Sequence, residues 1–313
     1  MSRPIAIVTA ACLMLGACTD GSPGLPVAQP QNEGTPKFAS ADELLTALET
    51  ADRGLRRLSA DVEYTKVFQP DGDVQVRRGS LFFTSDPPAA GAPAGEPDHR
   101  RFAVEFTVFF RGDRREDEQQ IFAFDGQWLM EKRPQEKWFH LRQVVRPGEA
   151  FDPLKIGQGP FPLPIGQKKA DILAEYDATL RPAADGLELE NLEDANDAEK
   201  RQAEMLIKDV AECWQVRLTP RLGVGKAPDF SEVRLWYMAD KTGRLLPQMA
   251  RTVAATDGPE IKGDIAIVRL INVKVNDAAE IKADVFDVRR PEHWDGQVDE
   301  LPRPGAAAPK AGG

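Results

Sequence analysis

Hydrophobic residues alternate with other residues over long stretches of the chain. In residues 101–110 every second position is apolar, and these positions are Phe102, Val104, Phe106, Val108 and Phe110. Successive side chains of a β-strand point to opposite faces, so this spacing predicts a strand with one strongly apolar face. A similar alternation is interrupted by Arg269 and runs through Ile265, Ile267, Ile271 and Val273. Long strands of this kind predict a sheet that curls around an apolar interior.

Eleven segments are predicted as strands from such patterns and from the turn residues that flank them. The first set comprises residues 61–69, 74–84, 101–111, 119–124, 128–132 and 137–144. The second set comprises residues 213–221, 231–239, 244–254, 265–276 and 283–288. Turn sequences such as Asp125-Gly126 separate several of them, because Asp tolerates left-handed backbone and Gly adopts it readily. The predicted fold is therefore mainly β (α+β) and antiparallel.

One amphipathic helix is predicted before the first strand. Apolar residues recur at spacings of three and four from Leu44 and Leu48 onward, which favours a helix over residues 41–60. Ser40 and Glu43 have the spacing of a capping box at its start. We expect this helix to cover the apolar interior of the sheet, with Leu44 and Leu48 as part of a lid.

Residues 145–180 fit neither a regular strand nor a long helix. Five prolines and four glycines fall between positions 147 and 166, where they interrupt an apolar run. The run is too apolar for a solvated loop, so we expect it to pack over the open side of the sheet. The lid hypothesis therefore also includes Phe151, Leu154, Phe161 and Leu163. A short helix is predicted next, over residues 168–176.

The first 18 residues have the layout of a cleavable export signal. A basic residue, Arg3, precedes an apolar run over residues 5–15, which is too short for the roughly 20 residues that span a bilayer. The following Leu15-Gly16-Ala17-Cys18 resembles the lipobox of bacterial lipoproteins. The resemblance implies that residues 1–17 are a signal peptide and that the Cys18 thiol is lipidated. An ordinary secretory signal followed by a chance cysteine is the alternative.

Composition divides the rest of the chain into a folded region and two flexible ends. Residues 18–38 are rich in Pro, Gly and polar residues and are predicted as a lipidated flexible tether. Residues 39–298 form the predicted folded domain, and residues 299–313 a disordered tail. Residues 86–98 are predicted as an exposed loop. The acidic stretch 183–212 contains a helical stripe that we interpret as ordinary core contact.

Charge and residue counts exclude several classes of function. The formal net charge of −10 argues against nucleic acid and anionic membrane surfaces as partners. The three histidines are scattered, and with Cys12 in the signal and Cys18 lipidated, Cys213 has no cysteine partner within the mature chain. The sequence also lacks the common motifs of nucleophilic, phosphate-binding and zinc-dependent catalysis. We therefore predict a protein that is not an enzyme, without cofactor or metal.

Four features in this order resemble the bacterial lipoprotein carriers of the Lol system, of the LolA and LolB type. They are the early helix with the strand 62–68, the turn Phe124-Asp125-Gly126-Gln127-Trp128-Leu129, the segment 151–164 and the ending Asp284 to Pro291. The resemblance implies an open, incomplete β-barrel whose helices cover a hydrophobic cavity for acyl chains. The loop 86–98 and the insertion 183–212 are additions to the family pattern. A lipobox occurs in the outer-membrane receptor branch and not in the soluble carrier branch.

The resemblance implies a membrane-anchored protein that binds the acyl chains of lipoproteins or lipids, with possible Lol-type export partners. The expected cavity residues are Phe102, Val104, Phe106, Val108, Phe110, Trp128, Ile265 and Ile267. Thr19, directly after the lipidated cysteine, favours the outer membrane over the inner membrane on the periplasmic side. The alternative is a lipid-anchored envelope sensor or scaffold of the same fold without transported cargo, and a hydrolase with an unrecognised site is a third hypothesis.

Overall fold

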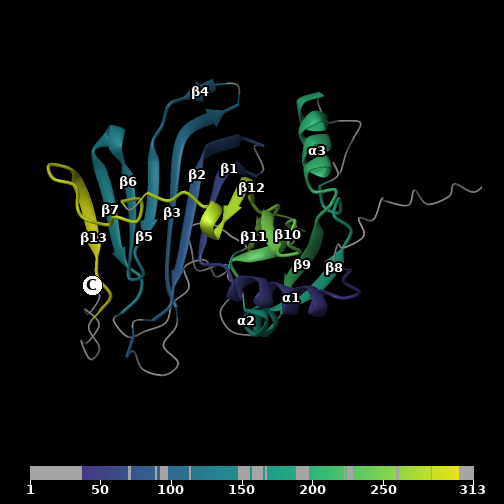
Figure 1. The fold of residues 1–313 in the computed structure, drawn as a ribbon. Helices are drawn as coiled ribbons and strands as arrows, with labels where there is room; N and C mark the ends of the chain where they lie inside the picture. Colours follow the sequence, from purple (N-terminus) through teal and green to yellow (C-terminus); the bar gives the residue numbers. More distant parts are fainter. Residues whose placement is uncertain are drawn as a thin grey trace, which may run out of the picture. The chain divides into compact units, whose positions relative to one another are not determined.

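The protein is built on one large sheet. The computed structural model describes residues 37–69, 72–88, 90–91, 98–112, 114–146, 156, 165, 168–187, 197–221, 223, 228–258, 261–282 and 284–302. In this part of the chain, 13 strands form a sheet in the order β13-β7-β6-β5-β3-β2-β1-β12-β11-β10-β9-β8, with β4 paired to β3 (Figure 1). The end strands β13 and β8 do not pair with each other, so the sheet is open.

Thirteen strands and three α-helices have these bounds in the described chain. The first strands are β1 (Arg57–Val67), β2 (Val74–Asp86), β3 (His99–Arg111), β4 (Arg114–Glu116), β5 (Gln120–Phe124), β6 (Trp128–Arg133) and β7 (Trp138–Gln143). The others are β8 (Tyr176–Arg181), β9 (Trp214–Pro220), β10 (Phe230–Ala239), β11 (Leu245–Ala254), β12 (Ile265–Val275) and β13 (Asp295–Asp299). The helices are α1 (Ala41–Arg53), α2 (Lys169–Glu175) and α3 (Asp197–Asp209), with 3-10 turns at Pro134–Glu136 and Asn276–Ala278. The predicted mainly β fold with an open sheet is confirmed.

The helices α1 and α2 pack on one face of the sheet, which we call the inner face. Figure 1 shows them together beside β8 and β9, away from α3. Leu44, Leu45 and Leu48 of α1 are buried against apolar residues of β9, β10 and β11. The amphipathic helix that the sequence predicts therefore covers this half of the sheet.

The start of α1 is as predicted, but its end is not. The Ser40 hydroxyl accepts a hydrogen bond from the Glu43 backbone at 3.2 Å, and the Glu43 carboxylate accepts one from the Ala39 backbone at 2.9 Å. The helix ends at Arg53, with Gly54 as C-cap, rather than at residue 60. The Asn276 side chain accepts from the Arg56 backbone and donates to the Gly54 carbonyl, so it holds the chain in the turn into β1.

A β-bulge changes the side-chain pattern of β3. Arg78 of β2 pairs with Val108, but the next residue, Gly79, pairs with Phe106, so Thr107 is an extra residue in the ladder. Beyond it, Phe109 pairs with Arg77 on the inner face, and Val108 moves to the opposite face. The prediction that Val108 and Phe110 share the face of Phe106 is therefore wrong, because an inserted residue reverses the alternation.

A second bulge reverses the pattern of β12. The register with β1 shifts between Ser59 and Asp61, so β12 carries one extra residue at the bulge. Asn272, which lies in the bulge, has a positive φ of 55°. Asn adopts this left-handed region more readily than most residues do. Val268 and Leu270 lie on the inner face before the bulge, and Val273 and Val275 lie there after it. A continuous face through Ile265, Ile267, Ile271 and Val273 is therefore not formed.

The remaining differences from the predicted strands lie near the ends of the sheet. Residues 284–286 form a turn instead of a strand, and Val285 and Phe286 pack on the opposite face of the sheet. The strand β13 follows instead and pairs with β7 in parallel. It includes Asp299, and the Leu301 backbone donates to the Gln143 side chain, so ordered chain continues past residue 298. Strand β8 follows directly after α2.

The opposite face of the sheet is also covered. At the β3–β7 side, Val285 and Phe286 contribute to an apolar cluster whose other members are Ala103, Ala123, Met130, Phe139 and Leu141. At the β10–β12 side, Leu206 and Val210, at the end of α3 and just after it, pack with Trp236 and Met249. This confirms the expectation that the apolar stripe in the acidic insertion makes ordinary core contacts. Both faces of the sheet are thus buried over much of their area.

Gly79 is required by the bulge in β3. A Cβ atom at this position would lie 1.8 Å from the backbone oxygen of Glu105. We therefore predict that Gly79→Ala lowers the free energy of unfolding by about 1–3 kcal/mol through overpacking. Gly258, where no atom lies within 4 Å of such a Cβ, is the matched control, and Gly258→Ala should change stability by less than about 0.5 kcal/mol. Urea denaturation measures both, and equal effects would contradict the assignment.

Candidate functional site

Apolar side chains on the inner face form two clusters. The first inner cluster consists of Leu55, Leu58, Ala60, Val62, Leu81, Phe83, Phe102, Val104, Phe106, Phe122, Phe124, Leu129, Val145, Ile165, Val268 and Leu270. The second inner cluster lies around α1 and α2 and includes residues of β8, β9, β10 and β11. Ala250 and Val268 are direct neighbours across β11 and β12, so the two clusters share one face of the sheet.

The first inner cluster spans β1, β2, β3, β5, β6 and β12. Its aromatic rings pack together: the rings of Phe102 and Phe124 are stacked 5.8 Å apart, and those of Tyr64 and Phe106 lie 6.2 Å apart. Every member of the cluster is less than a tenth exposed. This surface is therefore a filled apolar interior in the present structure.

The two inner clusters differ in what covers them. The second inner cluster is covered by the buried side chains of α1 and by Ile172 of α2. The members of the first inner cluster that lie outside strands are Leu55, Val145 and Ile165, and none of them belongs to a helix. Within the described residues, the first inner cluster therefore has no helical member, whereas the second is covered by α1 and α2 together with Ile156, which lies outside the helices.

Three of the expected cavity residues meet in the first inner cluster. They are Phe102, Val104 and Phe106 of β3. Trp128 lies on the opposite face, because its neighbour Leu129 points inward, and it packs with Met130 and Phe139.

The other expected cavity residues also lie outside the first inner cluster. Ile267 packs against the cluster of Trp236 on the opposite face. Ile265, two residues earlier in β12, points to that same face. Val108 and Phe110 lie beyond the bulge in β3. These residues do not share the surface with Phe106, because bulges and strand alternation place them on the other side of the sheet.

The expected lid residues fall in two groups. Leu44 and Leu48 are buried in the second inner cluster and not over the first. Phe151, Leu154, Phe161 and Leu163 lie outside the described residues, and so does Cys18. Of the same apolar run, Ile156 is buried in the second inner cluster and Ile165 in the first.

Sequence reasoning missed the contributions of β1 and β2 to the inner face. Val62 and Tyr64 of β1 and Leu81 and Phe83 of β2 belong to the first inner cluster or pack against it. Their spacing of two was visible in the sequence, but only the alternations in residues 101–110 and 265–273 were interpreted as interior faces.

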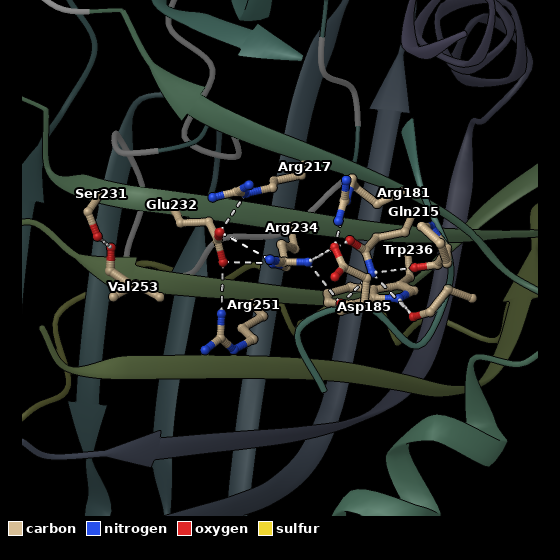
Figure 2. Close-up of polar contacts among 12 residues, drawn as sticks. Arg181, Asp185, Gln215, Arg217, Ser231, Glu232, Arg234, Trp236, Arg251 and Val253 are labelled. Atoms are coloured by element: carbon tan, nitrogen blue, oxygen red, sulfur yellow. Dashed lines mark hydrogen bonds and ion pairs between the residues drawn. The ribbon is translucent and has the colours of Figure 1, made fainter. Parts of the chain in front are cut away.

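The opposite face carries a cluster of arginines around Glu232, shown in Figure 2. The Glu232 carboxylate accepts hydrogen bonds from Arg217 at 2.6 Å, Arg234 at 2.7 Å and Arg251 at 3.0 Å. Burial would raise the pKa of Glu232, but the hydrogen bond and charge of Arg234 and the charges of the other two arginines lower it below its usual value. Glu232 is therefore ionised at neutral pH.

Arg234 joins this cluster to the turn after β8. Its Nη1 atom donates to the carboxylate of Asp185 at 2.8 Å and to the side chain of Gln215 at 3.0 Å. Gln215 in turn donates to the backbone oxygens of Pro182, Ala183 and Asp185 (Figure 2). The buried guanidinium is thus held by side chains and backbone together, which indicates a structural role in fixing the turn on the sheet.

A pocket of about 430 Å³ opens near the start of β3. Its lining residues are His99, Arg101, Asp125, Asp284, Phe286, Asp287 and Arg289. Asp125 accepts hydrogen bonds from the backbone of its own turn, and hydrogen bonds from Arg289 lower the pKa of Asp287 to about 2. Six of the seven lining side chains are polar, so the pocket does not suit a hydrocarbon chain.

The described residues do not assemble a site for metal or thiol chemistry. They contain no group of three or more His, Cys, Asp or Glu side chains placed to hold a metal ion. Burial raises the pKa of Cys213 to about 12, so its thiol is protonated at neutral pH and a poor nucleophile. None of the described helices is long and apolar enough to cross a membrane.

The Asp185–Arg234 pair predicts a pH-dependent contribution to stability. Hydrogen bonds from Arg181 and Arg234 lower the pKa of Asp185 well below its usual value. The ionised form therefore stabilises the fold above about pH 4, and the contribution is lost as the pH falls further. We predict that Asp185→Asn costs about 1–3 kcal/mol at pH 7 and that its difference from wild type shrinks below pH 4.

The matched control is Asp177→Asn. Asp177 accepts from Arg221 at 2.8 Å, but its side chain is 67% exposed, so its removal should cost less than about 1 kcal/mol. Denaturant unfolding between pH 2.5 and 7 measures both variants. A constant difference between wild type and Asp185→Asn across this range would contradict the role given to Asp185.

Comparisons with known proteins give distant structural likenesses. No protein-family model and no curated protein matches the chain. The similar solved structures include an uncharacterized conserved protein from Thermus thermophilus, which is 13% identical, with 83% of this chain and 99% of that chain covered and a TM-score of 0.36. The LolA superfamily protein NE2245 from Nitrosomonas europaea is 11% identical, with 80% and 98% covered and a TM-score of 0.33.

LprF from Mycobacterium bovis is a further similar structure. It is 12% identical, with 77% of this chain and 97% of that chain covered and a TM-score of 0.31. At these identities and TM-scores the likenesses do not assign a function to this chain.

Proposed function

We propose that the protein is a membrane-anchored, non-enzymatic binding protein for acyl chains, with the first inner cluster as its binding surface. The observation that carries the proposal is a continuous apolar surface across six strands whose members outside the strands, within the described chain, are Leu55, Val145 and Ile165, none of them from a helix. The cellular role we propose is transport or localisation of lipoproteins within the cell envelope.

The distribution of charge supports a hydrocarbon ligand on the inner face. Among the described residues, the two charged side chains that are buried are Glu63 and Arg234. Glu63 lies between Val62 and Tyr64, which point inward, so it points to the opposite face. Arg234 likewise belongs to the arginine cluster on that face. A ligand on the first inner cluster would therefore meet hydrocarbon and aromatic side chains, as acyl chains require.

The energy of binding comes from exchange of one apolar cover for another. Burial of hydrocarbon contributes roughly 25 cal/mol for each Å² removed from water. Because the first inner cluster is already filled, an acyl chain gains this energy only if covering side chains such as Ile165 move away. The cover and the ligand therefore compete for the same surface.

The proposed anchor is the lipidated Cys18 thiol. It lies outside the described residues, and the proposal rests on the lipobox-like sequence Leu15 to Cys18. Thr19 favours the outer membrane as the destination. A single acyl chain gives only marginal membrane binding, whereas the two chains of a diacylglyceryl group anchor a protein stably.

Removal of Ile165 should increase affinity for a neutral acyl ligand. We predict that Ile165→Ala, which removes a competitor from the first inner cluster, binds methyl oleate several-fold more tightly. A tenfold increase in affinity would correspond to a gain of about 1.4 kcal/mol in binding free energy. Ile172→Ala is the matched control, because it removes the same atoms from the second inner cluster. Each variant should lose about 2–5 kcal/mol of stability. Displacement of a fluorescent hydrophobic probe measures the affinities.

Two outcomes would contradict the proposed function. Weaker binding by Ile165→Ala than by wild type would make Ile165 part of the ligand wall instead of its cover. Failure of the wild-type chain to bind methyl oleate, together with absence of co-purified lipid in mass spectrometry, would favour the lipid-anchored scaffold without cargo.

Lipidation can be tested independently of acyl binding. We predict that Cys18→Ser abolishes incorporation of a palmitate analogue in growing cells, because the substitution removes the acceptor thiol. Cys213→Ser is the control, since Cys213 is buried in the fold and should not affect labelling. Label retained on the Cys18→Ser protein would refute the proposed anchor.

A further inference from the structure

Arg77 lies at one end of the first inner cluster. In the ladders of β1, β2 and β3, Arg77 is directly opposite Tyr64 on one side and Phe109 on the other. Along β2 the same inner-facing row continues through Gly79, Leu81 and Phe83. The apolar surface that begins at Phe83 therefore ends at a guanidinium group.

The hydrogen-bonding capacity of Arg77 is not satisfied within the described chain. Its Nε atom is buried and has no hydrogen-bond partner there. The carboxylate that pairs with it, that of Glu118, lies 3.6 Å from Nη2, beyond the usual hydrogen-bond distance. A buried donor without a partner costs about 1–3 kcal/mol, so its retention calls for an explanation.

The guanidinium of Arg77 is nevertheless held in a defined orientation. It lies over the ring of Phe109, with 4.3 Å between the guanidinium carbon and the ring centroid. Its side chain is 21% exposed, so it is accessible from the rim of the cluster. Burial raises the pKa of Tyr64, although the charge of Arg77 opposes this, so the tyrosine is neutral at neutral pH and does not neutralise the guanidinium.

The next residue, Arg78, differs from Arg77 in that its Nε atom has a hydrogen-bond partner. Its side chain points to the opposite face, where its Nε atom donates to the Glu63 carboxylate at 2.7 Å. Glu63 also accepts from Arg269 at 2.7 Å, so the charges there are paired at hydrogen-bond distance. Two adjacent arginines of one strand thus differ in that one has a hydrogen-bonded carboxylate and the other does not.

We infer that Arg77 binds the anionic head group, a carboxylate or a phosphate, of an amphiphile whose hydrocarbon chain lies on the first inner cluster. The inference rests on the proposed acyl-binding function and adds the chemistry of the ligand's polar end. A guanidinium offers several N–H donors in a planar fork that matches carboxylate and phosphate oxygens. Such an anion would supply the partner that Nε lacks and would replace the distant carboxylate of Glu118.

The test compares ligands that share one chain and differ in the head group. The full chain in the Cys18→Ser background, which lacks the proposed attached lipid, is titrated with oleate, oleoyl lysophosphatidate and methyl oleate below their micelle concentrations. We expect at least one of the two anionic ligands to bind at least tenfold more tightly than methyl oleate. The anion that gains the larger factor distinguishes a carboxylate source from a phosphate source.

The matched variants are Arg77→Met and Arg78→Met. Arg77→Met should reduce the preference for anionic ligands to less than about threefold and leave the affinity for methyl oleate unchanged. Arg78→Met, which removes the same charge from the same strand, should retain the preference. Unchanged binding of methyl oleate by Arg77→Met also shows that the variant is folded.

A second variant keeps the inference falsifiable if Arg77→Met does not fold. Glu118→Gln removes the carboxylate that competes for Arg77, so it should raise the affinity for the anionic ligand several-fold and not that for methyl oleate. Equal affinities of wild type for anionic and neutral ligands, or an Arg77→Met variant that keeps the preference, would overturn the inference while the acyl-binding proposal stands. Failure of wild type to bind any of the three ligands would overturn both.

Discussion

Burial of both faces of the sheet constrains every strand in its centre. Successive side chains of such a strand point to opposite faces, so the register decides which side chains enter each core and whether a charged side chain reaches a partner. In β1, Val62 points inward and Glu63 points to the opposite face, where Arg78 and Arg269 pair with it. A slip of one residue would place this carboxylate in the first inner cluster, at the cost of an unpaired buried charge.

The same separation of charge leaves two apolar clusters on the inner face, with Arg77 at one end of the first. One half of that face is closed by α1 and α2, whose leucines complete a conventional core. The other half is closed, within the described chain, by residues such as Leu55 and Ile165, which lie outside helices. The apolar surface that these residues bury contributes to stability through the hydrophobic effect. An acyl chain can bury the same surface, which is why the proposed ligand belongs on this half.

The sequence predicted those features that depend on local periodicity. The start of α1 at Ser40 and most strands follow from spacing and capping, and three consecutive inner positions of β3 follow from strict alternation. It failed where one inserted residue reverses the pattern, at Thr107 and Asn272, because a bulge depends on the partner strand and leaves no periodic signal. The parallel pairing of β13 also depends on contacts between residues far apart in the chain. The inward position of Arg77 could be recognised only from the register of β2 between its neighbours.

The central claim is that acyl chains bind on the first inner cluster, and photocrosslinking measures this most directly. A methyl ester of a fatty acid with a diazirine within its chain would be bound to the protein and activated, and the crosslinked residues identified by mass spectrometry. The account predicts crosslinks to the inner-facing residues within 58–64, 81–83, 102–106, 122–129 and 268–270, which are the strand members of the first inner cluster. Crosslinks confined to residues 214–218 and 233–237, or scattered over the surface of the sheet's opposite face, would contradict it.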